Sequence, residues 1–496
     1  MPRNRISPER PQATSPLHRR QRWWPWLVAA PMAACLTVAC TSAVAGTAAD
    51  RSLTAGPSTS ADTASVGADT SNGTSNGTSN STSNSTSNSN SNGAAVASGT
   101  TKVTASGASG PVDCSPPDTK QAPCYSPRAY QVTYGVAPLL RRGIDGSGET
   151  VVMPELPQTP APRGGPTDIR QDLAAFDKAF GLPAAKLNVI QAVTRSATPY
   201  LANDEEVEDT EMVHAMAPGA TLDVVLVPAN ATASSANFAA AATKVIQESA
   251  TLHAGVLSIS ASIGEHFLTP AESAAMHAAL VQASEQHVTV VVSSGDGGAI
   301  SDDGPPVQVS MPASDPLVLA VGGTELDATN PGGTYLGEMA WNGGTDGSGG
   351  GYSSLFARPS YQDGLARAGA GRDGAGRGVP DVAANAYADT AMAIEYSDGE
   401  FRPATGTSAS TPLWAGVIAL ADQQAGRHLG FVNPAIYAIA RGPAYHQAFH
   451  DVTTGDNSVL WPTGVFTGYN AGPGWDPVTG WGSPDAQYLV PLLAHG

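Results

Sequence analysis

Basic side chains are scarce in this sequence of 496 residues. Lys and Arg together number 25 against 43 Asp and Glu, and the formal net charge at pH 7 is −18. Phosphate backbones and anionic lipids attract positively charged surfaces, and the sequence has no basic patch that would offset its acidity. We therefore expect neither nucleic acid nor an anionic membrane surface as a partner.

Cysteine is also scarce. Only four are present, and Cys35 and Cys40 lie in a segment that has the pattern of an export signal. A mature chain that begins at Gly46 keeps Cys114 and Cys124. Two thiols in an exported protein indicate one disulfide that closes a short loop.

An apolar run near the N-terminus falls short of a membrane span. Residues 1–24 are basic and lead into WLVAAPMAACLTVA (residues 26–39), which is too short for an ordinary spanning helix. Ala43-Val44-Ala45 supplies the small-x-small pattern that a signal peptidase reads. The sequence predicts a signal peptide at residues 1–45 and a secreted, extracellular protein. Lipid anchoring at the cell surface through Cys40 is the alternative, and it would be the one attachment to a membrane.

Apolar side chains are almost absent between Arg51 and Gly110, where Ser, Thr, Asn, Gly and Ala dominate. Such a segment cannot bury enough apolar surface to offset the entropy lost on folding. We predict a disordered tether at residues 46–110 and one globular domain at residues 111–496.

The globular part alternates short apolar runs, rich in β-branched residues, with helix-like stretches. This is the pattern of βαβ units around a parallel sheet that is buried on both faces. The predicted strands cover residues 149–156, 187–193, 221–227, 256–260, 288–294 and 316–321. Thr269-Pro270-Ala271-Glu272 predicts a helix start, because it combines an N-cap hydroxyl, an N1 proline and a capping-box glutamate. We expect an α/β fold with a mostly parallel central sheet flanked by helices on both faces, and chemistry at the carboxyl ends of its strands.

A nucleophile candidate lies in the segment 404–417. Gly406 allows a tight turn before a helix of small residues that opens at Ser408. Backbone N–H groups and the helix dipole stabilise a developing oxyanion at such a position. Taken alone, Gly-Thr-Ser-Ala-Ser is also an ordinary helix cap.

A serine nucleophile needs a base, and no His-Gly-Thr-His type motif is present to supply a histidine. Residues 203–220 are instead dense in carboxylates. Glu205 and Asp209 are four residues apart and share one helix face. Such a pair shares a proton and would act as a base in acid. Solvated acids in a first helical turn are the competing interpretation.

Histidine-based sites fit the pattern less well. His214 lies five residues after Asp209, off the face shared with Glu205. His446 and His450 have a spacing that zinc helices use, but the glutamate of that motif is missing and a Gly-Pro pair at 442–443 argues against a long helix. We expect neither a triad built on His214 nor a zinc peptidase.

Two further segments carry carboxylates in irregular backbone. Asp296 follows an apolar strand and is flanked by glycines. It is either a turn residue or a protonated acid that donates a hydrogen bond to an oxyanion. Near the C-terminus, Asp451-Val452 and Gly472-Pro-Gly-Trp-Asp476 combine two carboxylates with several carbonyls, a set of hard ligands that suits calcium.

Together these segments resemble the sedolisins, serine-carboxyl peptidases with a subtilisin-like fold that act at low pH. The resemblance covers nearly the whole globular part. Its motifs occur in order at Tyr134–Leu140, Gly143–Val151, Ala217–Ala220, Ser293–Asp296, Pro312–Ser314, Val321–Thr324, Gly349–Ser353, Val379–Val382, Gly406–Ser410 and Thr479–Gly482.

By position, the resemblance implies Ser408 as nucleophile, Glu205 as general base, Asp209 as supporting acid and Asp296 as oxyanion stabiliser. The implied activity is endopeptidase hydrolysis of polypeptides at acidic pH through an acyl-enzyme. We expect a monomer, because nothing in the sequence suggests an obligate partner. A tripeptidyl exopeptidase of the same family and an inactive surface binding module are the alternatives. The presence of all four expected residue types argues against the inactive module.

The resemblance also implies one structural calcium ion. Its ligands would be the side chains of Asp451 and Asp476 and the carbonyls of Val452, Gly472 and Gly474.

Two features depart from the family pattern. Family members carry a sizeable folded prodomain, whereas here only the predicted tether separates the signal from the enzyme-like start. Ala261 and Ser262 stand where relatives commonly have Trp and Gly beside the substrate cleft, so subsite preference is not carried over.

Overall fold

The computed structural model describes residues 124–155, 168–191, 204–228, 230–365, 375–388, 391–395 and 401–496. The predicted signal peptide, the predicted tether and Cys114 lie outside these residues. Cys124 is buried at the start of the described chain. The boundaries of the three predicted segments and the disulfide therefore stay predictions.

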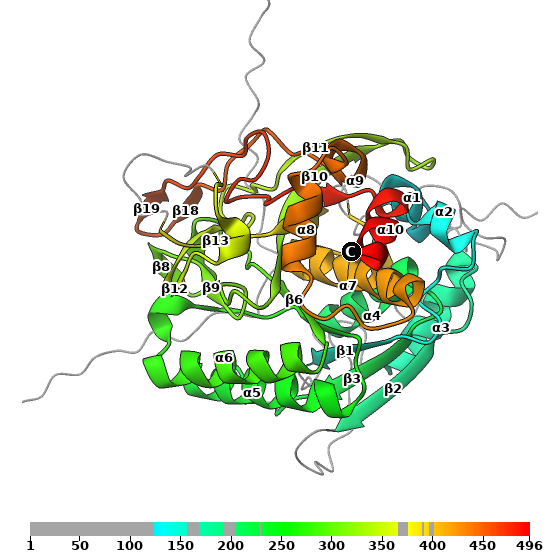
Figure 1. Cartoon of the computed structure of the whole chain (residues 1–496), viewed down its shortest axis with the longest axis horizontal. Helices are drawn as coiled ribbons and strands as arrows, with labels where there is room; N and C mark the ends of the chain where they lie inside the picture. The colour runs from blue at the N-terminus through cyan, green and yellow to red at the C-terminus, as the bar shows by residue number, and fades with distance from the viewer. Residues whose placement is uncertain are drawn as a thin grey trace, which may run out of the picture. The chain divides into compact units, whose positions relative to one another are not determined.

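A central sheet of eight strands organises the described residues (Figure 1). From one edge to the other its strands are β11 (Tyr335–Ala340), β10 (Leu319–Ala328), β6 (Thr289–Ser293), β4 (Val256–Ile259), β1 (Thr150–Glu155), β3 (Thr221–Leu226) and β2 (Lys186–Gln191), and β14 (Val382–Asn385) also pairs with β10. All of these pairings are parallel except that of β11 with β10. The predicted α/β fold with a mostly parallel sheet is confirmed.

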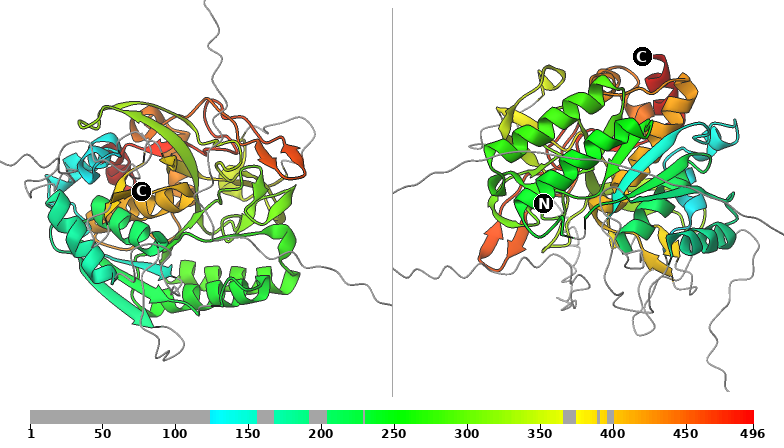
Figure 2. Two further views of the ribbon diagram at one scale, coloured as in Figure 1. Left: turned by 180° about the vertical axis from the view of Figure 1, so that it is seen from behind. Right: turned by 90° about the horizontal axis from the view of Figure 1, so that it is seen from below.

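Side chains of the central strands alternate between two cores. Val151 and Met153 pack in a core with α4 (Asp204–Met216) and α7 (Gly406–Ala425), whereas Val152 packs with α5 (Ser235–Thr251) and α6 (Pro270–Glu285). Burying each such side chain stabilises the fold by about 1.5–3 kcal/mol. The strands read as unbroken apolar runs because both faces of the sheet are covered by helices (Figures 1 and 2).

Smaller elements complete the described structure. The other helices are α1 (Pro127–Thr133), α2 (Ala137–Leu140), α3 (Ile169–Phe180), α8 (Asn433–Ala440), α9 (Tyr445–Ala448) and α10 (Ala486–His495), with short 3-10 turns at Glu265–Phe267 and Ser360–Gln362. Two-stranded pairs join β5 (Ile263–Gly264) to β9 (Ser310–Met311), β7 (Ile300–Ser301) to β8 (Gly304–Val307), β12 (Gly351–Ala357) to β13 (Gly376–Val379), β15 (Ala393–Glu395) to β16 (Phe401–Pro403), β17 (Phe449–His450) to β20 (Ser483–Pro484), and β18 (Val459–Trp461) to β19 (Gly464–Phe466). Within the described ranges, no helix is both long and apolar enough for a membrane span.

The six predicted strands occur as β1, β2, β3, β4, β6 and β10. Both bounds predicted for β10 were wrong. The strand starts at Leu319 rather than Pro316, and it continues past Val321 to Ala328 because its second half pairs with β11. The helix start at Thr269 is confirmed, since the Thr269 side chain caps Glu272 N while the Glu272 carboxylate accepts the Thr269 N–H at 2.7 Å.

The predicted start of α7 was also wrong by two residues. The helix begins at Gly406, so Ser408 is its third residue. Gly406 has a φ of +82°, in the left-handed region that favours glycine, which confirms the tight turn.

Candidate active site

The carboxyl ends of β1, β4 and β6 meet two helices at one place in the fold. This is the edge of a parallel sheet at which α/β proteins generally bind their ligands. Helix α4 brings Glu205 and Asp209, and the first turn of α7 brings Ser408. Asp296 follows β6. The structure therefore brings together all four residues that the sequence singled out.

Glu205 lies beside the candidate nucleophile, because the Ser408 side chain is one of the groups that act on its pKa. Ser408 is only 7% exposed. Loss of hydration raises the pKa of Glu205 well above its usual range, repulsion from Asp209 raises it further, and the Ser408 side chain lowers it. Two carboxyl groups this close do not both ionise readily, so Glu205 and Asp209 titrate as a pair.

Asp209 is almost fully buried, at 1% exposed. Ser260, just after β4, donates its hydroxyl to Asp209 Oδ1 at 2.9 Å, and the same Oγ lies 3.4 Å from the carbonyl oxygen of Ser408. Burial raises the pKa of Asp209 to about 7, against the lowering effect of hydrogen bonds from Glu155 and Ser260. Ser260 therefore links the acid pair to the backbone of the candidate nucleophile.

Glu155 is a site residue that the sequence analysis missed. It is the last residue of β1, is 2% exposed, and is hydrogen-bonded to Asp209. Its Oε1 and the Oδ2 of Asp209 are both buried where no donor group of the described residues reaches them. Two carboxyl groups in this arrangement are satisfied by one shared proton. The signal was present in the sequence as a lone acid at the end of a buried apolar strand.

Asp296 lies against the start of α7. Its Oδ1 accepts both the backbone N–H and the hydroxyl of Thr407, each at 2.8 Å. Burial raises the pKa of Asp296 to about 6, although both bonds from Thr407 lower it. Because both bonds fall on Oδ1, the Oδ2 oxygen can carry a proton. A Cβ atom on Gly406 would lie 2.5 Å from that Oδ2, so the close approach requires glycine.

His214 does not take part in this cluster. Its Nε2 lies 2.9 Å from both Asp177 Oδ1 and the carbonyl oxygen of Pro183, and the ring is fully buried. His446 lies in the four-residue helix α9 and His450 in β17. His214 is therefore engaged with Asp177 and Pro183, and His446 and His450 lie in two different elements rather than on one helix.

Known proteins are similar to this chain over most of its length. A sequence model of the Subtilase family matches residues 194–435. Kumamolisin of Bacillus sp. (strain MN-32) is 36% identical over 363 residues, which are 71% of this chain and 61% of kumamolisin. The solved structure of Pseudomonas sedolisin, a serine-carboxyl proteinase complexed with pseudo-iodotyrostatin, matches 75% of this chain and 98% of its own at 27% identity and a TM-score of 0.60. The chain belongs to the sedolisin family.

Sedolisin-family homologues are serine-type peptidases. Human tripeptidyl-peptidase 1 is also similar, at 33% identity over 278 residues that are 50% of this chain and 44% of the human protein. The chain thus spans less than two thirds of the length of these curated relatives. The subtilisin-like architecture expected from the sequence is confirmed by the sedolisin neighbour.

The predicted calcium ligands of this sedolisin-family chain also converge. Asp451 accepts the Gly474 N–H with both carboxylate oxygens, at 3.1 Å each, and Asp476 Oδ2 accepts the Gly472 N–H at 3.1 Å. Asp476 is 4% exposed, and burial raises its pKa to about 7 despite several hydrogen bonds from neutral groups. A buried carboxylate with only neutral donors around it is stabilised by a cation, and two carboxylates with nearby carbonyls suit calcium. The residues therefore fit the implied ion.

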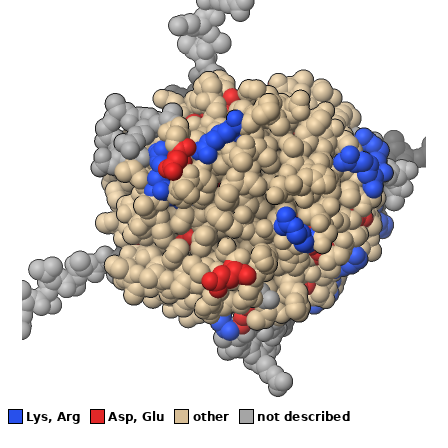
Figure 3. All heavy atoms as spheres, in the orientation of Figure 1, with Lys and Arg blue, Asp and Glu red and all other residues tan. Residues whose placement is uncertain are grey.

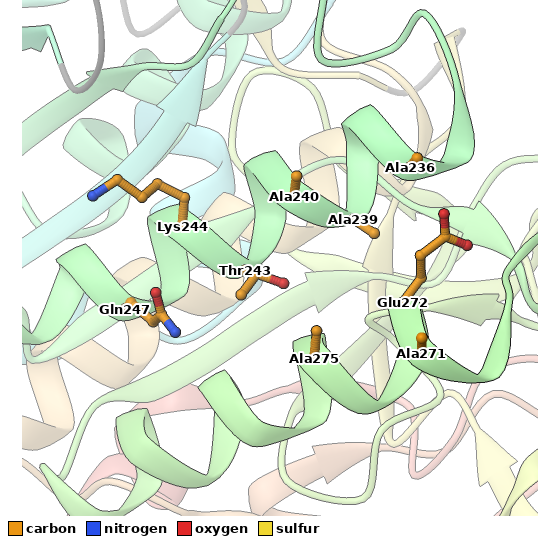
Figure 4. A pocket seen from close by; sticks show the side chains of 9 residues that line it. All are labelled: Ala236, Ala239, Ala240, Thr243, Lys244, Gln247, Ala271, Glu272 and Ala275. Atoms are coloured by element: carbon orange, nitrogen blue, oxygen red, sulfur yellow. The ribbon is translucent and has the colours of Figure 1, made fainter. Parts of the chain in front are cut away.

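Other surface features lie apart from this site. A groove between α5 and α6 is lined mainly by small side chains, including Ala236, Ala240 and Ala275, with Lys244 and Glu272 at its sides (Figure 4). None of the residues that line it belongs to the carboxyl cluster. On the face seen in Figure 3, Lys and Arg are scattered among uncharged residues and form no continuous basic patch.

Proposed function

We propose that this chain is a secreted serine-carboxyl endopeptidase that cleaves polypeptides in acid. The observation that carries the proposal is the series of neighbouring carboxyl groups Glu155, Asp209 and Glu205, which ends beside the side chain of Ser408. A histidine would be charged and unable to accept a proton in acid, whereas a carboxylate in a proton-sharing cluster still can.

In the first step, Ser408 Oγ attacks the carbonyl carbon of the scissile peptide bond while Glu205 takes the hydroxyl proton. Asp209 holds Glu205 in place, and Glu155 and Ser260 hold Asp209. Glu205 then gives the proton to the leaving amine, which breaks the C–N bond and leaves an acyl-enzyme on Ser408. Water, deprotonated by Glu205, then attacks the acyl carbon. Glu205 returns that proton to Ser408 Oγ as the ester bond breaks, and the second product leaves with a new carboxyl group.

The tetrahedral intermediate carries a negative oxygen that needs hydrogen-bond donors. The backbone N–H of Ser408 and a proton on Asp296 Oδ2 are the proposed donors. A carboxylic acid can serve in this way only while it is protonated. The pKa of about 6 for Asp296 keeps that proton in place at pH 4 and removes it near neutrality.

The pH dependence follows from these two requirements. Activity requires one ionised carboxylate in the Glu155–Asp209–Glu205 cluster, which sharing of a proton provides in acid, and a proton on Asp296, so it falls at both extremes of pH. The loss on the alkaline side is expected near pH 6, where Asp296 gives up the proton that it donates.

One calcium ion at Asp451, Val452, Gly472, Gly474 and Asp476 is part of the proposal. When bound, it would neutralise the two carboxylates and join two loop segments. Secretion, a monomeric state and polypeptide substrates are likewise proposed, on the basis of the signal-like N-terminus and the family. The lipid anchor at Cys40 remains the alternative to free secretion.

The test is cleavage of an unfolded protein by the purified chain at pH about 4 and about 7, values on either side of the Asp296 pKa. The variants are Ser408→Ala and Glu205→Gln. Asp204→Asn is the matched control, because Asp204 is the adjacent carboxyl on α4 and is exposed. We expect acid-limited cleavage that is lost in both site variants and kept in the control.

Fragment lengths decide between the two peptidase modes. Fragments of varied length indicate an endopeptidase, and a ladder of tripeptides indicates the exopeptidase. A folded chain that cleaves nothing at either pH would exclude the peptidase and favour the inactive binding module.

A further inference from the structure

The first turn of α7 is capped by groups from outside the helix. Thr405 is the N-cap residue, but its side chain makes no capping hydrogen bond. Counting from Thr405, Ser408 is the N3 residue. In a capping box the N3 position holds a Glu or Gln whose side chain accepts the N–H of the N-cap residue. A serine nucleophile at N3 cannot make that bond and also attack a substrate.

Three successive backbone N–H groups before Ser408 find other acceptors. Gly406 N donates to the carbonyl oxygen of Ala386 at 2.8 Å. Thr407 N donates to Asp296 Oδ1 at 2.8 Å. Thr405 N, the donor that a capping box would satisfy, donates to Glu208 Oε2 at 3.1 Å. The Ser408 N–H is the next donor along the turn.

Glu208 reaches Thr405 from α4, one residue before Asp209. It is 6% exposed, and its Oε1 is buried with no donor of the described residues in reach. The charged groups that act on it are all acidic: Glu205 and Asp209 from α4, and Asp296 from the loop after β6. Glu155 of β1 lies one carboxyl further away, against Asp209.

We propose that Glu208 is a positioning residue for Ser408. From α4 it accepts the Thr405 N–H, a capping bond that a Glu or Gln side chain at the N3 position would otherwise make. This inference rests on the proposed function only in calling Ser408 the nucleophile. Through Thr405, Glu208 fixes the backbone from which both the Ser408 hydroxyl and the Ser408 N–H project. The Glu208 carboxyl, which is bonded to Thr405 rather than to Ser408, thus sets the geometry of the reacting atoms.

The state of Glu208 that fits this role is the neutral acid. Burial raises its pKa well above the usual range, and repulsion from Glu205 adds to the effect, while the bond from Thr405 lowers it. A group whose pKa is higher in the folded state contributes stability that is present below its unfolded pKa and is lost as the pH rises. Glu208 therefore favours an ordered first turn in acid.

The test uses the full chain with two substitutions. Glu208→Leu removes the acceptor, and Glu208→Gln keeps an acceptor oxygen but cannot ionise. Loss of one buried hydrogen bond at the site is expected to lower kcat of Glu208→Leu about tenfold at pH 4, with KM changed less than about twofold. Glu208→Gln is expected to restore most of that loss, and Asp204→Asn serves as the control.

Hydrogen exchange of residues 403–408 and the pH dependence of Tm complete the test without relying on activity. We expect faster exchange in Glu208→Leu but not in Glu208→Gln. We also expect the Tm of Glu208→Gln to increase relative to that of the parent as the pH rises above 4.5, the ordinary pKa of a glutamate side chain. Parental kcat in a folded Glu208→Leu, or equal losses in both variants, would overturn the proposal. If the folded parent cleaves nothing, the proposed function fails, and unchanged exchange in Glu208→Leu would separately refute the capping role.

Discussion

Asp422 allows a test of whether buried carboxyl groups make this fold more stable in acid than at neutral pH. It lies in α7, fourteen residues after Ser408, or roughly 21 Å along the helix at 1.5 Å per residue. The side chain is fully buried, and its Oδ1 accepts the Leu429 N–H at 2.8 Å, whereas no donor of the described residues reaches Oδ2. Burial raises the pKa of Asp422 to about 8; Glu149 raises it further, and the Leu429 N–H and Arg427 lower it.

The sign and size of the effect follow from linkage. Because the folded pKa is above the unfolded value, the folded state binds the proton more tightly, and this stabilisation is complete below about pH 3.8 and declines as the pH rises towards 8. At 1.36 kcal/mol per pKa unit, the loss reaches about 4 kcal/mol by pH 7. Asp422→Asn keeps the acceptor for Leu429 and never ionises. The variant should therefore match the parent at pH 4 and exceed it at pH 7.

Calorimetric melting at pH 4 and pH 7 measures this difference. At roughly 2 °C per kcal/mol, Asp422→Asn is expected to raise Tm by roughly 8 °C at pH 7 and to leave it unchanged at pH 4. Asp327→Asn is the matched control, since Asp327 is an exposed strand residue on β10. A Tm gain of equal size at both pH values, or a lower Tm at pH 7, would refute the reasoning.

Three further changes probe the site and the calcium loops. Ser260→Ala removes a hydrogen bond that lowers the pKa of Asp209, so the acid limb of the pH–rate profile should move to higher pH and kcat at pH 4 should fall about tenfold; a profile identical to that of the parent would argue against the link. Gly406→Ala places a Cβ 2.5 Å from Asp296 Oδ2 at a φ of +82°, so it should cost about 1–2 kcal/mol of stability by melting and most of the peptidase activity. Chelation of calcium should lower Tm by several degrees and added calcium should restore it, whereas Asp451→Asn should melt at the same temperature with and without chelator.

Much of the central sheet could be predicted, because strands covered on both faces must be apolar throughout. Strand β11 could not be predicted in this way. Its side chains are mostly half-buried or exposed, it lies at an edge of the sheet, and its pairing with the second half of β10 joins segments separated by a turn. Edge strands carry a weak apolar signal, so their existence is decided by a partner strand rather than by their own composition.

The residues of the candidate site also differ in whether the sequence could predict them. Glu205 and Asp209 could be paired from sequence because helical periodicity fixes which residues share a face. Glu155, Ser260 and Glu208 could not, because their roles depend on contacts between separate elements. The Glu208 bond to Thr405 joins positions 197 residues apart, and the Ser260 bond to Asp209 joins positions 51 apart. Local pattern predicts which side chains an element presents, and only the fold shows what they meet.

The buried carboxyls at the two ends of α7 connect stability with the proposed chemistry. Near its N-terminus, burial raises the pKa values of Asp209 and Asp296 to about 7 and about 6. At its other end Asp422 rises to about 8. Each group must be neutral to be buried cheaply, so each contributes stability that is lost as the pH approaches neutrality. The same protonation that keeps Asp296 as a donor therefore also holds the helix that carries Ser408. On this argument, substitutions that neutralise the distant Asp422 should extend the pH range in which the protein stays folded. They should not move the alkaline limb of its activity, because that limb is assigned to Asp296 at the other end of the helix.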